Sequence, residues 1–137
     1  MKAKPLAEAN KEEDVSAGID YILATAYADQ GLYDLGKQYA RSAIAAFKEL
    51  NIQNRVAESY SALAYVYFQQ GDYDSALYYY HIDYSIEKNL DDLLTRAIAQ
   101  DDIATVFLER SGRKNVHPDI DSAMYYFKTA LQSYTKN

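Results

Sequence analysis

A chain of 137 residues has the size of one ordinary domain, and its 49% hydrophobic and 25% charged residues are typical of a globular protein. Its formal net charge of −6 argues against nucleic acid or an anionic membrane surface as partner, because both repel an acidic protein. The chain has no cysteine, which excludes disulfides and thiolate metal sites, and it has no apolar run of about 18 residues that would span a membrane.

The N-terminal residues lack the apolar stretch of a signal peptide. The compartment therefore stays open. We expect a cytoplasmic protein if the chain begins at its native N-terminus, and a periplasmic one if it is the excised sensor domain of a longer protein.

The first helix pair is predicted from its caps and turn residues. Pro5–Glu13 fits a short helix that would be the tail of a truncated preceding unit, residues 1–13. Asp14 is the expected N-cap of a helix over Val15–Gln30, and Gly31 is expected to end that helix, because glycine takes the left-handed conformation without steric cost. A second helix is predicted over Tyr33–Leu50, since apolar residues recur there at helical spacing.

The rest of the chain repeats this order of helix, turn and helix. The predicted segments are the connector Asn51–Asn54, the helices Arg55–Gln70 and Tyr73–Lys88, the turn Asn89–Asp92 with Asp91 or Asp92 as N-cap, the helix Leu93–Arg110, the insertion Ser111–Pro118 and the helix Asp119–Thr135. No segment alternates with a period of two residues, so an all-α fold is predicted.

An internal repeat with a period of 40 residues organises the chain. Three sets of residues recur at this spacing: Leu23, Leu63 and Ile103; Ala24, Ala64 and Ala104; Tyr27, Tyr67 and Phe107. The segment Asp72–Tyr80 (DYDSALYYY) returns as Asp119–Phe127 (DIDSAMYYF) at an offset of 47, so the third unit carries seven extra residues. Such a period is typical of stacked helical repeats that share one core. We expect one domain over residues 1–137, with repeats at 14–53, 54–91 and 92–137 and the insertion at 111–118.

These residues resemble the tetratricopeptide repeat (TPR). Its unit carries a leucine, a small residue and an aromatic on the first helix, a Gly-x-Tyr turn, and then an alanine and an aromatic on the second helix. The second unit matches most fully, through Tyr60, Leu63, Ala64, Tyr67, Gly71, Tyr73, Ala76 and Tyr80. Gly36 departs from the pattern where alanine is usual, and Asp83 departs where a small residue is usual. The period of 40 residues is similar to that of TPR arrays in bacterial sensor and regulator proteins.

The resemblance implies a TPR-like α-solenoid, a right-handed superhelical stack of antiparallel helix pairs whose first helices line a concave groove. The groove-facing positions would be Tyr21, Thr25, Asp29, Glu58, Ser61, Tyr65, Phe68, Gln69, Asp101, Thr105, Leu108 and Glu109. Aromatic anchors are the usual energetic centre of peptide binding, and the acidic side chains would favour a basic partner. Some family members grip a peptide's C-terminal carboxylate with lysine and asparagine, which are absent from these positions, so no such clamp is expected.

We therefore predict a non-enzymatic scaffold, a protein–protein interaction module that holds a peptide or protein segment in the groove. The alternative is a sensory or regulatory TPR domain of a larger bacterial signalling or transcription-regulating protein. No catalytic constellation and no phosphate-binding glycine loop occurs in the sequence, so no cofactor is expected. His117, Asp119 and Asp121 cluster near the insertion, but no second histidine lies nearby and no metal site is expected.

An apolar stripe near the end of the last predicted helix indicates a second surface. Repeat arrays normally end in a capping element with a polar outer face, and no such element follows this stripe in the sequence. We hypothesise that Phe127, Leu131 and Tyr134 form an association surface, for a second copy of the chain (a homo-oligomer) or for further domains. The fifteen tyrosines are otherwise interpreted as packing residues.

Overall fold

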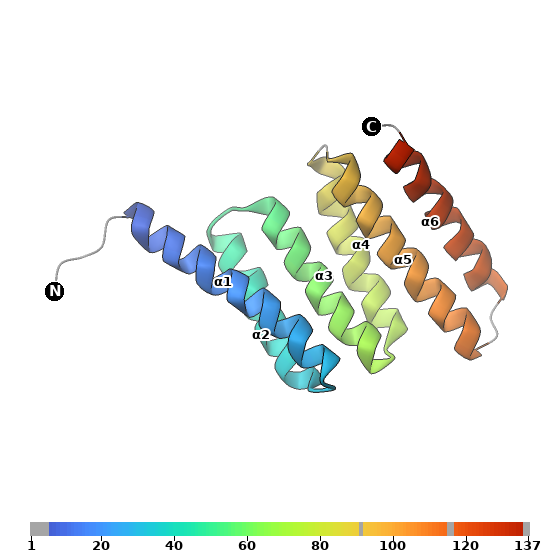
Figure 1. Cartoon of the computed structure of the whole chain (residues 1–137), viewed down its shortest axis with the longest axis horizontal. Coiled ribbons are helices and arrows are strands. Elements are labelled where there is room, and N and C mark those ends of the chain that lie inside the picture. The colour runs from blue at the N-terminus through green and yellow to red at the C-terminus, as the bar shows by residue number, and fades with distance from the viewer. Residues whose placement is uncertain (1–5, 91, 115–116, 136–137) are drawn as a thin grey trace.

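Six α-helices follow one another in the computed structural model, which describes residues 6–90, 92–114 and 117–135. They are α1 (Leu6–Asp29), α2 (Tyr33–Glu49), α3 (Gln53–Gln70), α4 (Tyr73–Asn89), α5 (Leu93–Lys114) and α6 (His117–Thr135) (Figure 1). No strand occurs in these ranges, and the predicted all-α solenoid is confirmed.

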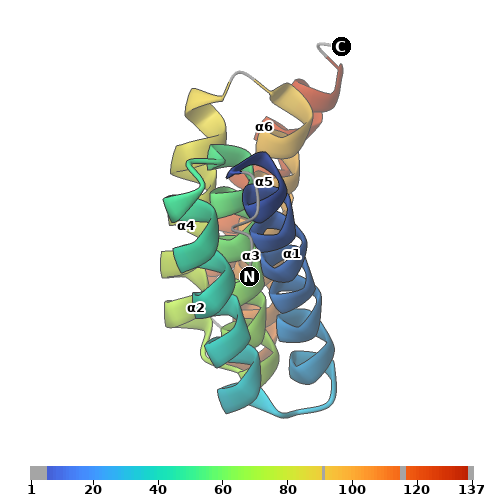
Figure 2. The ribbon, with the colours of Figure 1, turned by 90° about the vertical axis from the view of Figure 1, so that its left-hand side faces the viewer.

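The helices form a row of antiparallel pairs in two layers. Each helix packs against the next along the chain, and α1 and α6 lie at opposite ends of the row (Figure 1). A view along the row shows α2 and α4 on one side and α1 and α5 on the other (Figure 2). The first helices α1 and α5 therefore lie in one layer, with α3 packed against α1, and the second helices α2 and α4 lie in the other (Figure 2).

Glycine and aspartate residues set the helix boundaries as the sequence predicts. Gly31 and Gly71 follow α1 and α3 with φ of 79° and 86°, in the left-handed region that only glycine adopts without strain. Asp72 caps α4 by accepting a hydrogen bond from the Ser75 amide at 3.2 Å. Of the two candidates before α5, Asp92 accepts from the Leu94 and Thr95 amides at 3.1 and 3.3 Å, and residue 91 lies outside the described residues.

Two predicted interruptions are wrong. The expected break at Asp14 is absent, because α1 runs without interruption from Leu6 to Asp29 and no proline or glycine stands there to end it. The predicted insertion Ser111–Pro118 is also not a loop throughout. Residues 111–114 continue α5, α6 begins at His117, and residues 115–116 lie outside the described part. Gly112 is therefore accommodated inside a helix.

Small residues and stacked aromatics recur at the repeat spacing in the core. Ala24, Ala64 and Ala104 are fully buried, so the backbones of neighbouring helices can approach closely. In every helix pair one aromatic ring of the first helix stacks on one of the second. These pairs, with ring centroids 5.5, 5.5 and 5.9 Å apart, are Tyr27 with Tyr39, Tyr67 with Tyr79, and Phe107 with Tyr126. For these tyrosines the packing interpretation holds.

Gly36 departs from the repeat pattern because three helices meet at its position. A Cβ atom on Gly36 of α2 would lie 3.0 Å from the carbonyl oxygen of Ala24 in α1. It would also lie 3.1 Å from a methyl carbon of Val66 in α3. A hydrogen atom in place of a side chain therefore lets α2 sit deep between α1 and α3.

Candidate binding groove

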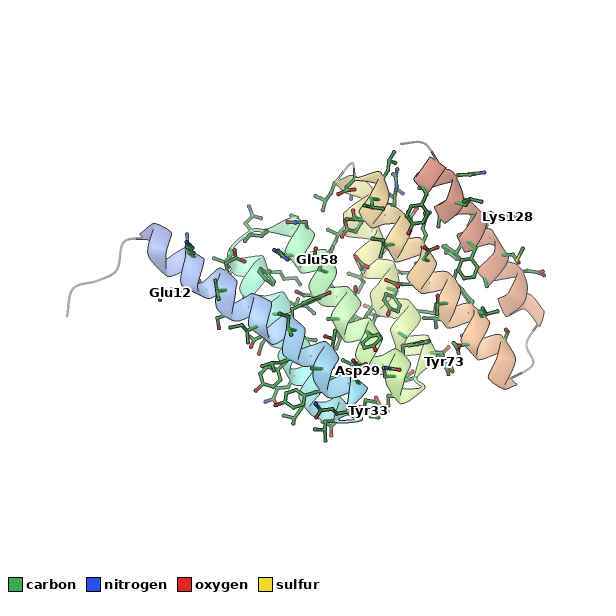
Figure 3. All side chains as sticks on the ribbon, viewed as in Figure 1. Glu12, Asp29, Tyr33, Glu58, Tyr73 and Lys128 are labelled. Atoms are coloured by element: carbon green, nitrogen blue, oxygen red, sulfur yellow. The ribbon has the colours of Figure 1, made fainter. Side chains whose placement is uncertain are left out.

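The predicted groove residues all lie on the layer of first helices. Tyr21, Thr25 and Asp29 come from α1, Glu58, Ser61, Tyr65, Phe68 and Gln69 from α3, and Asp101, Thr105, Leu108 and Glu109 from α5. Glu58 and Asp29 lie toward opposite ends of this surface (Figure 3). The structure divides the predicted groove residues into separate groups that have different environments.

One group ties α1 to α3 near the C-terminal ends of both helices. The Tyr65 hydroxyl donates a hydrogen bond to the Asp29 carboxylate. The Gln69 side-chain amide donates to the same carboxylate at 3.1 Å and to the Tyr65 hydroxyl at 2.8 Å. Burial and the bond to Asp29 raise the pKa of Tyr65. These three side chains hold two helices together, and their remaining polar surface faces the solvent.

A second group lines an opening between α3 and α5. The helix α1 packs against α3, but α3 and α5 scarcely approach each other. Tyr80 of α4 is buried against Ile103 and Val106 of α5, whereas the equivalent position 40 residues earlier is Ala40. A bulky ring therefore stands in α4 where the first unit has a methyl group in α2.

Two cavities occupy this opening. The larger, of about 220 Å³, is named here the acidic pocket. It is lined by Tyr21, Glu58, Ser61, Asp83, Glu87, Thr95, Ile98, Ala99 and Asp102. The smaller, of about 130 Å³, is lined by Tyr65, Phe68, Tyr80, Asp102, Thr105 and Val106. Predicted residues of α1, α3 and α5 thus meet in these cavities, while the floor comes from α4.

The sequence analysis did not assign the three carboxylates that dominate the acidic pocket. Asp83 is only 4% exposed, and burial together with Glu87, Asp102 and Glu58 raises its pKa to about 8. Burial and the neighbouring Asp101 raise the pKa of Asp102 to about 7. Burial raises the pKa of Glu87, and a hydrogen bond from Thr95 opposes that shift in part. The only sign of the acidic pocket in the sequence was Asp83, which departs from the repeat pattern at a position where a small residue is usual.

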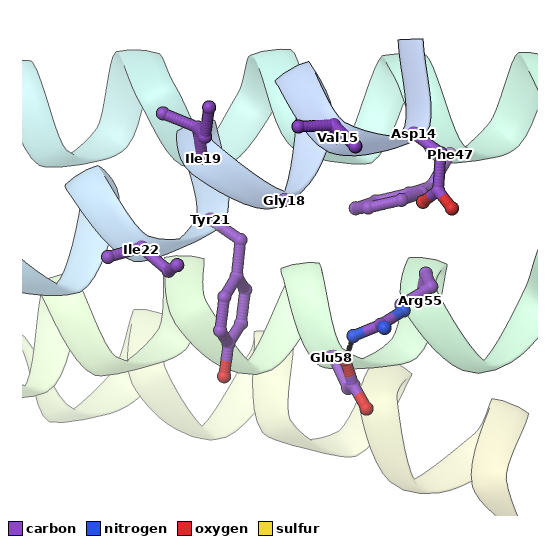
Figure 4. Close-up of a pocket in the computed structure, with 9 residues that line it drawn as sticks. All are labelled: Asp14, Val15, Gly18, Ile19, Tyr21, Ile22, Phe47, Arg55 and Glu58. Atoms are coloured by element: carbon purple, nitrogen blue, oxygen red, sulfur yellow. Dashed lines mark hydrogen bonds and ion pairs between the residues drawn. The ribbon is translucent and has the colours of Figure 1, made fainter. Parts of the chain in front are cut away.

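A different pocket lies between α1 and α3, over α2. It measures about 440 Å³, and its apolar wall contains Val15, Ile19 and Ile22 of α1 with Phe47 of α2 (Figure 4). The Arg55–Glu58 ion pair of α3, at 3.0 Å, closes one side. Val15, Ile19 and Ile22 are all exposed. The wall of this pocket is mainly apolar, whereas carboxylates line the acidic pocket.

The remaining predicted groove residues lie along α5. Asp101 accepts a hydrogen bond from the Tyr134 hydroxyl of α6 at 2.9 Å, so this carboxylate is tied to the last helix. Leu108 and Glu109 are exposed. They offer a surface beyond the two cavities.

The predicted C-terminal association surface lies on α6. Phe127, Leu131 and Tyr134 are all exposed, Leu131 to 61%. Among the described helices, α6 packs against α5. Whether another chain covers these side chains stays a prediction.

Metal and membrane sites find no support in the described residues. No group of three or more histidine, aspartate or glutamate side chains there could hold a metal ion. The side chains of His117 and Asp119 lie outside what the structure describes. None of the helices, over their described lengths, combines the length and the apolar character needed to cross a bilayer.

Stacked antiparallel helix pairs define a helical-repeat module. A family model described as tetratricopeptide repeat matches residues 16–81. The TPR domain of Arabidopsis FLU, a crystal structure, has the same fold, with a TM-score of 0.72 at 15% sequence identity over 93% of this chain and 99% of that chain. No curated protein matches the sequence.

Residues 16–81 match the tetratricopeptide repeat, and the chain as a whole has the fold of a TPR domain. This fold generally mediates protein–protein interaction, and its domains are typically non-catalytic modules that bind proteins or peptides.

Proposed function

We propose that this protein is a non-enzymatic interaction module that holds a segment of a partner protein along the first-helix layer, across α3 and α5. The observation that carries the proposal is the opening between these helices. It contains two adjoining cavities, and predicted groove residues from all three first helices line them. Concave sites with a few converging polar groups are where proteins usually bind their ligands.

The surface beside the cavities has the character of a peptide-binding site. Tyr65 and Leu108 present partly exposed apolar area, and aromatic side chains serve as anchors for bound segments. The first-helix layer also carries more exposed carboxylates than basic groups at the predicted positions, which favours a basic segment through faster association.

An affinity capture from lysate of the source organism, read by mass spectrometry, tests the proposal. The groove variant combines Tyr65→Ala with Leu108→Ala. We leave Phe68 intact because its ring packs on Tyr73 at 5.8 Å and its removal would disturb the core. Circular dichroism must first show that the variant folds.

The matched control combines Tyr78→Ala with Tyr125→Ala. These two tyrosines lie on α4 and α6 and are 63% and 64% exposed, so the same kind of side chain is removed from the other layer. A partner that the wild type and the control capture, and the groove variant does not, supports the proposal. Equal capture by both variants would move the site away from the groove, and capture of no partner by the wild type would contradict an interaction role.

A further inference from the structure

Three of the four carboxylates that line the acidic pocket lack a basic partner, and the fourth, Glu58, is paired with Arg55 at 3.0 Å. Asp83 and Glu87 come from α4 and Asp102 from α5, and none of them forms an ion pair in the described part of the chain. Asp83 is the strongest case, because it is almost fully buried, lines the cavity and has no hydrogen-bond partner among the described residues. No lysine, arginine or histidine is among the residues that line the pocket.

The fold itself does not require these carboxylates. The positions 40 residues before Asp83 and Glu87 are Ala43 and Phe47, and both are buried apolar side chains of α2. The equivalent place in the first unit, the pocket of about 440 Å³ between α1 and α3, therefore has hydrocarbon where the acidic pocket has these two carboxylates. A buried charge without a partner is costly, and the raised pKa of Asp83 is the sign of that cost. Packing within the second unit does not explain why these carboxylates are buried at a cost in folding free energy.

The carboxylates that line the acidic pocket limit the class of ligand that it can bind. An anion would be repelled, and an apolar group would leave the carboxylates without partners. A metal ion needs several ligands that converge on one point, and no such group of three exists among the described residues. A larger cation with several separated donors fits carboxylates that are spread over α4 and α5.

We propose that the acidic pocket receives the guanidinium group of one arginine in the bound protein segment, an inference that rests on the groove being the binding surface. A guanidinium carries five N–H donors in a planar fork, so it can meet carboxylates from two helices at once. Ile98 and Ala99 of α5 offer apolar wall for the aliphatic stem of the arginine. The Tyr21 ring, which also lines the pocket, can stack on the cation.

Binding of an arginine should release protons from the pocket. The groups that face Asp83 are Glu87 on its own helix, Glu58 on α3, Asp102 on α5 and, at the wall, Tyr21 of α1. A cation favours the ionised carboxylates, while the arginine stays charged throughout. Affinity should therefore rise between about pH 6 and about pH 8.5, as the carboxylates ionise.

The test uses Nα-acetyl-L-arginine methylamide as the probe, titrated into the ¹⁵N-labelled protein and followed by NMR. We expect saturable shift changes confined to amides of α3, α4 and α5 around the pocket. The citrulline analogue has the same shape without the charge and should bind about tenfold or more weakly. The Asp83→Asn/Glu87→Gln variant should lose arginine binding by a similar factor.

A matched variant controls for net charge. Asp34→Asn/Glu49→Gln removes two exposed carboxylates of α2, and it should leave arginine binding unchanged. Equal binding of the arginine and citrulline probes, or unchanged binding by the pocket variant, would overturn the proposal. So would equal binding of the lysine analogue, or displacement of the arginine probe by equimolar Ca²⁺.

The probe experiment needs no partner protein, so its result is separable from the capture experiment. If a partner depends on Tyr65 and Leu108 but the arginine probe does not bind, the pocket assignment fails and the proposed function stands. If the probe binds in the pocket but the wild type captures no partner, the pocket chemistry stands and the proposed function fails.

Discussion

The substitution Asp83→Asn should stabilise the protein at alkaline pH. The folded state raises the pKa of this carboxyl from 3.8 to about 8, so between these values the folded chain binds more protons than the unfolded chain. Stability therefore falls as the pH rises from about 4 to about 8 and then levels off. Asparagine has nearly the same shape as aspartate and no charge, so the variant should not lose this part of its stability as the pH rises.

The magnitude follows from the size of the shift. The interval between 3.8 and about 8, at roughly 1.4 kcal/mol per pKa unit, sets a ceiling of roughly 6 kcal/mol. The buried amide keeps a desolvation cost of about 1–3 kcal/mol of its own when it lacks partners. We therefore expect a net gain of at most about 3–5 kcal/mol at about pH 8.5 and little gain at about pH 4.5.

Urea unfolding followed by circular dichroism at both pH values measures the effect. Asp34→Asn is the matched control, because it makes the same chemical change at an exposed position of α2. Asp102 and Glu87 also have raised pKa values, so the wild type alone will lose stability with pH. The difference between Asp83→Asn and wild type measures this carboxyl together with its repulsion of Glu87, Asp102 and Glu58. A variant less stable than wild type at both pH values would refute the reasoning.

Three further predictions concern packing, capping and association. Gly36→Ala should destabilise the fold by about 1–3 kcal/mol, because crowding against Ala24 and Val66 outweighs a gain in helix propensity of about 1 kcal/mol. Thermal unfolding measures this effect, and a higher melting temperature for the variant would show that the helices can separate to make room. Asp72→Ala should cost about 1 kcal/mol in urea unfolding through the lost cap of α4, and no change would indicate that another group replaces the cap. Sedimentation should show concentration-dependent association that Leu131→Glu abolishes, and a monomer at every concentration would exclude the α6 surface.

Local signals in the sequence were sufficient for the elements and their order. Gly31 and Gly71 mark two turns because their positive φ is a property of the backbone at one residue. The 40-residue repeat predicts stacked helix pairs because identical units bury their apolar faces on one another. The residues that the TPR resemblance assigns to the groove lie on the first helices α1, α3 and α5.

Where the local signal was weak, the element boundaries went wrong. Asp14 has the chemistry of a helix cap, yet nothing near it breaks the helix, and α1 continues through it. Gly112 has the chemistry of a turn residue, yet a glycine inside a helix costs only about 1 kcal/mol, which packing against neighbouring helices can outweigh.

The amino-acid sequence by itself determined the fold class and the pairing of helices, because these depend on spacing along one chain. Only the tertiary structure decided what the departures from the repeat do. Gly36 matters because α1 and α3 both reach it, and Asp83 matters because the spacing of α3 and α5 leaves a cavity above it. Burial, pKa and cavity volume arise where several helices converge, and no single stretch of sequence contains that information.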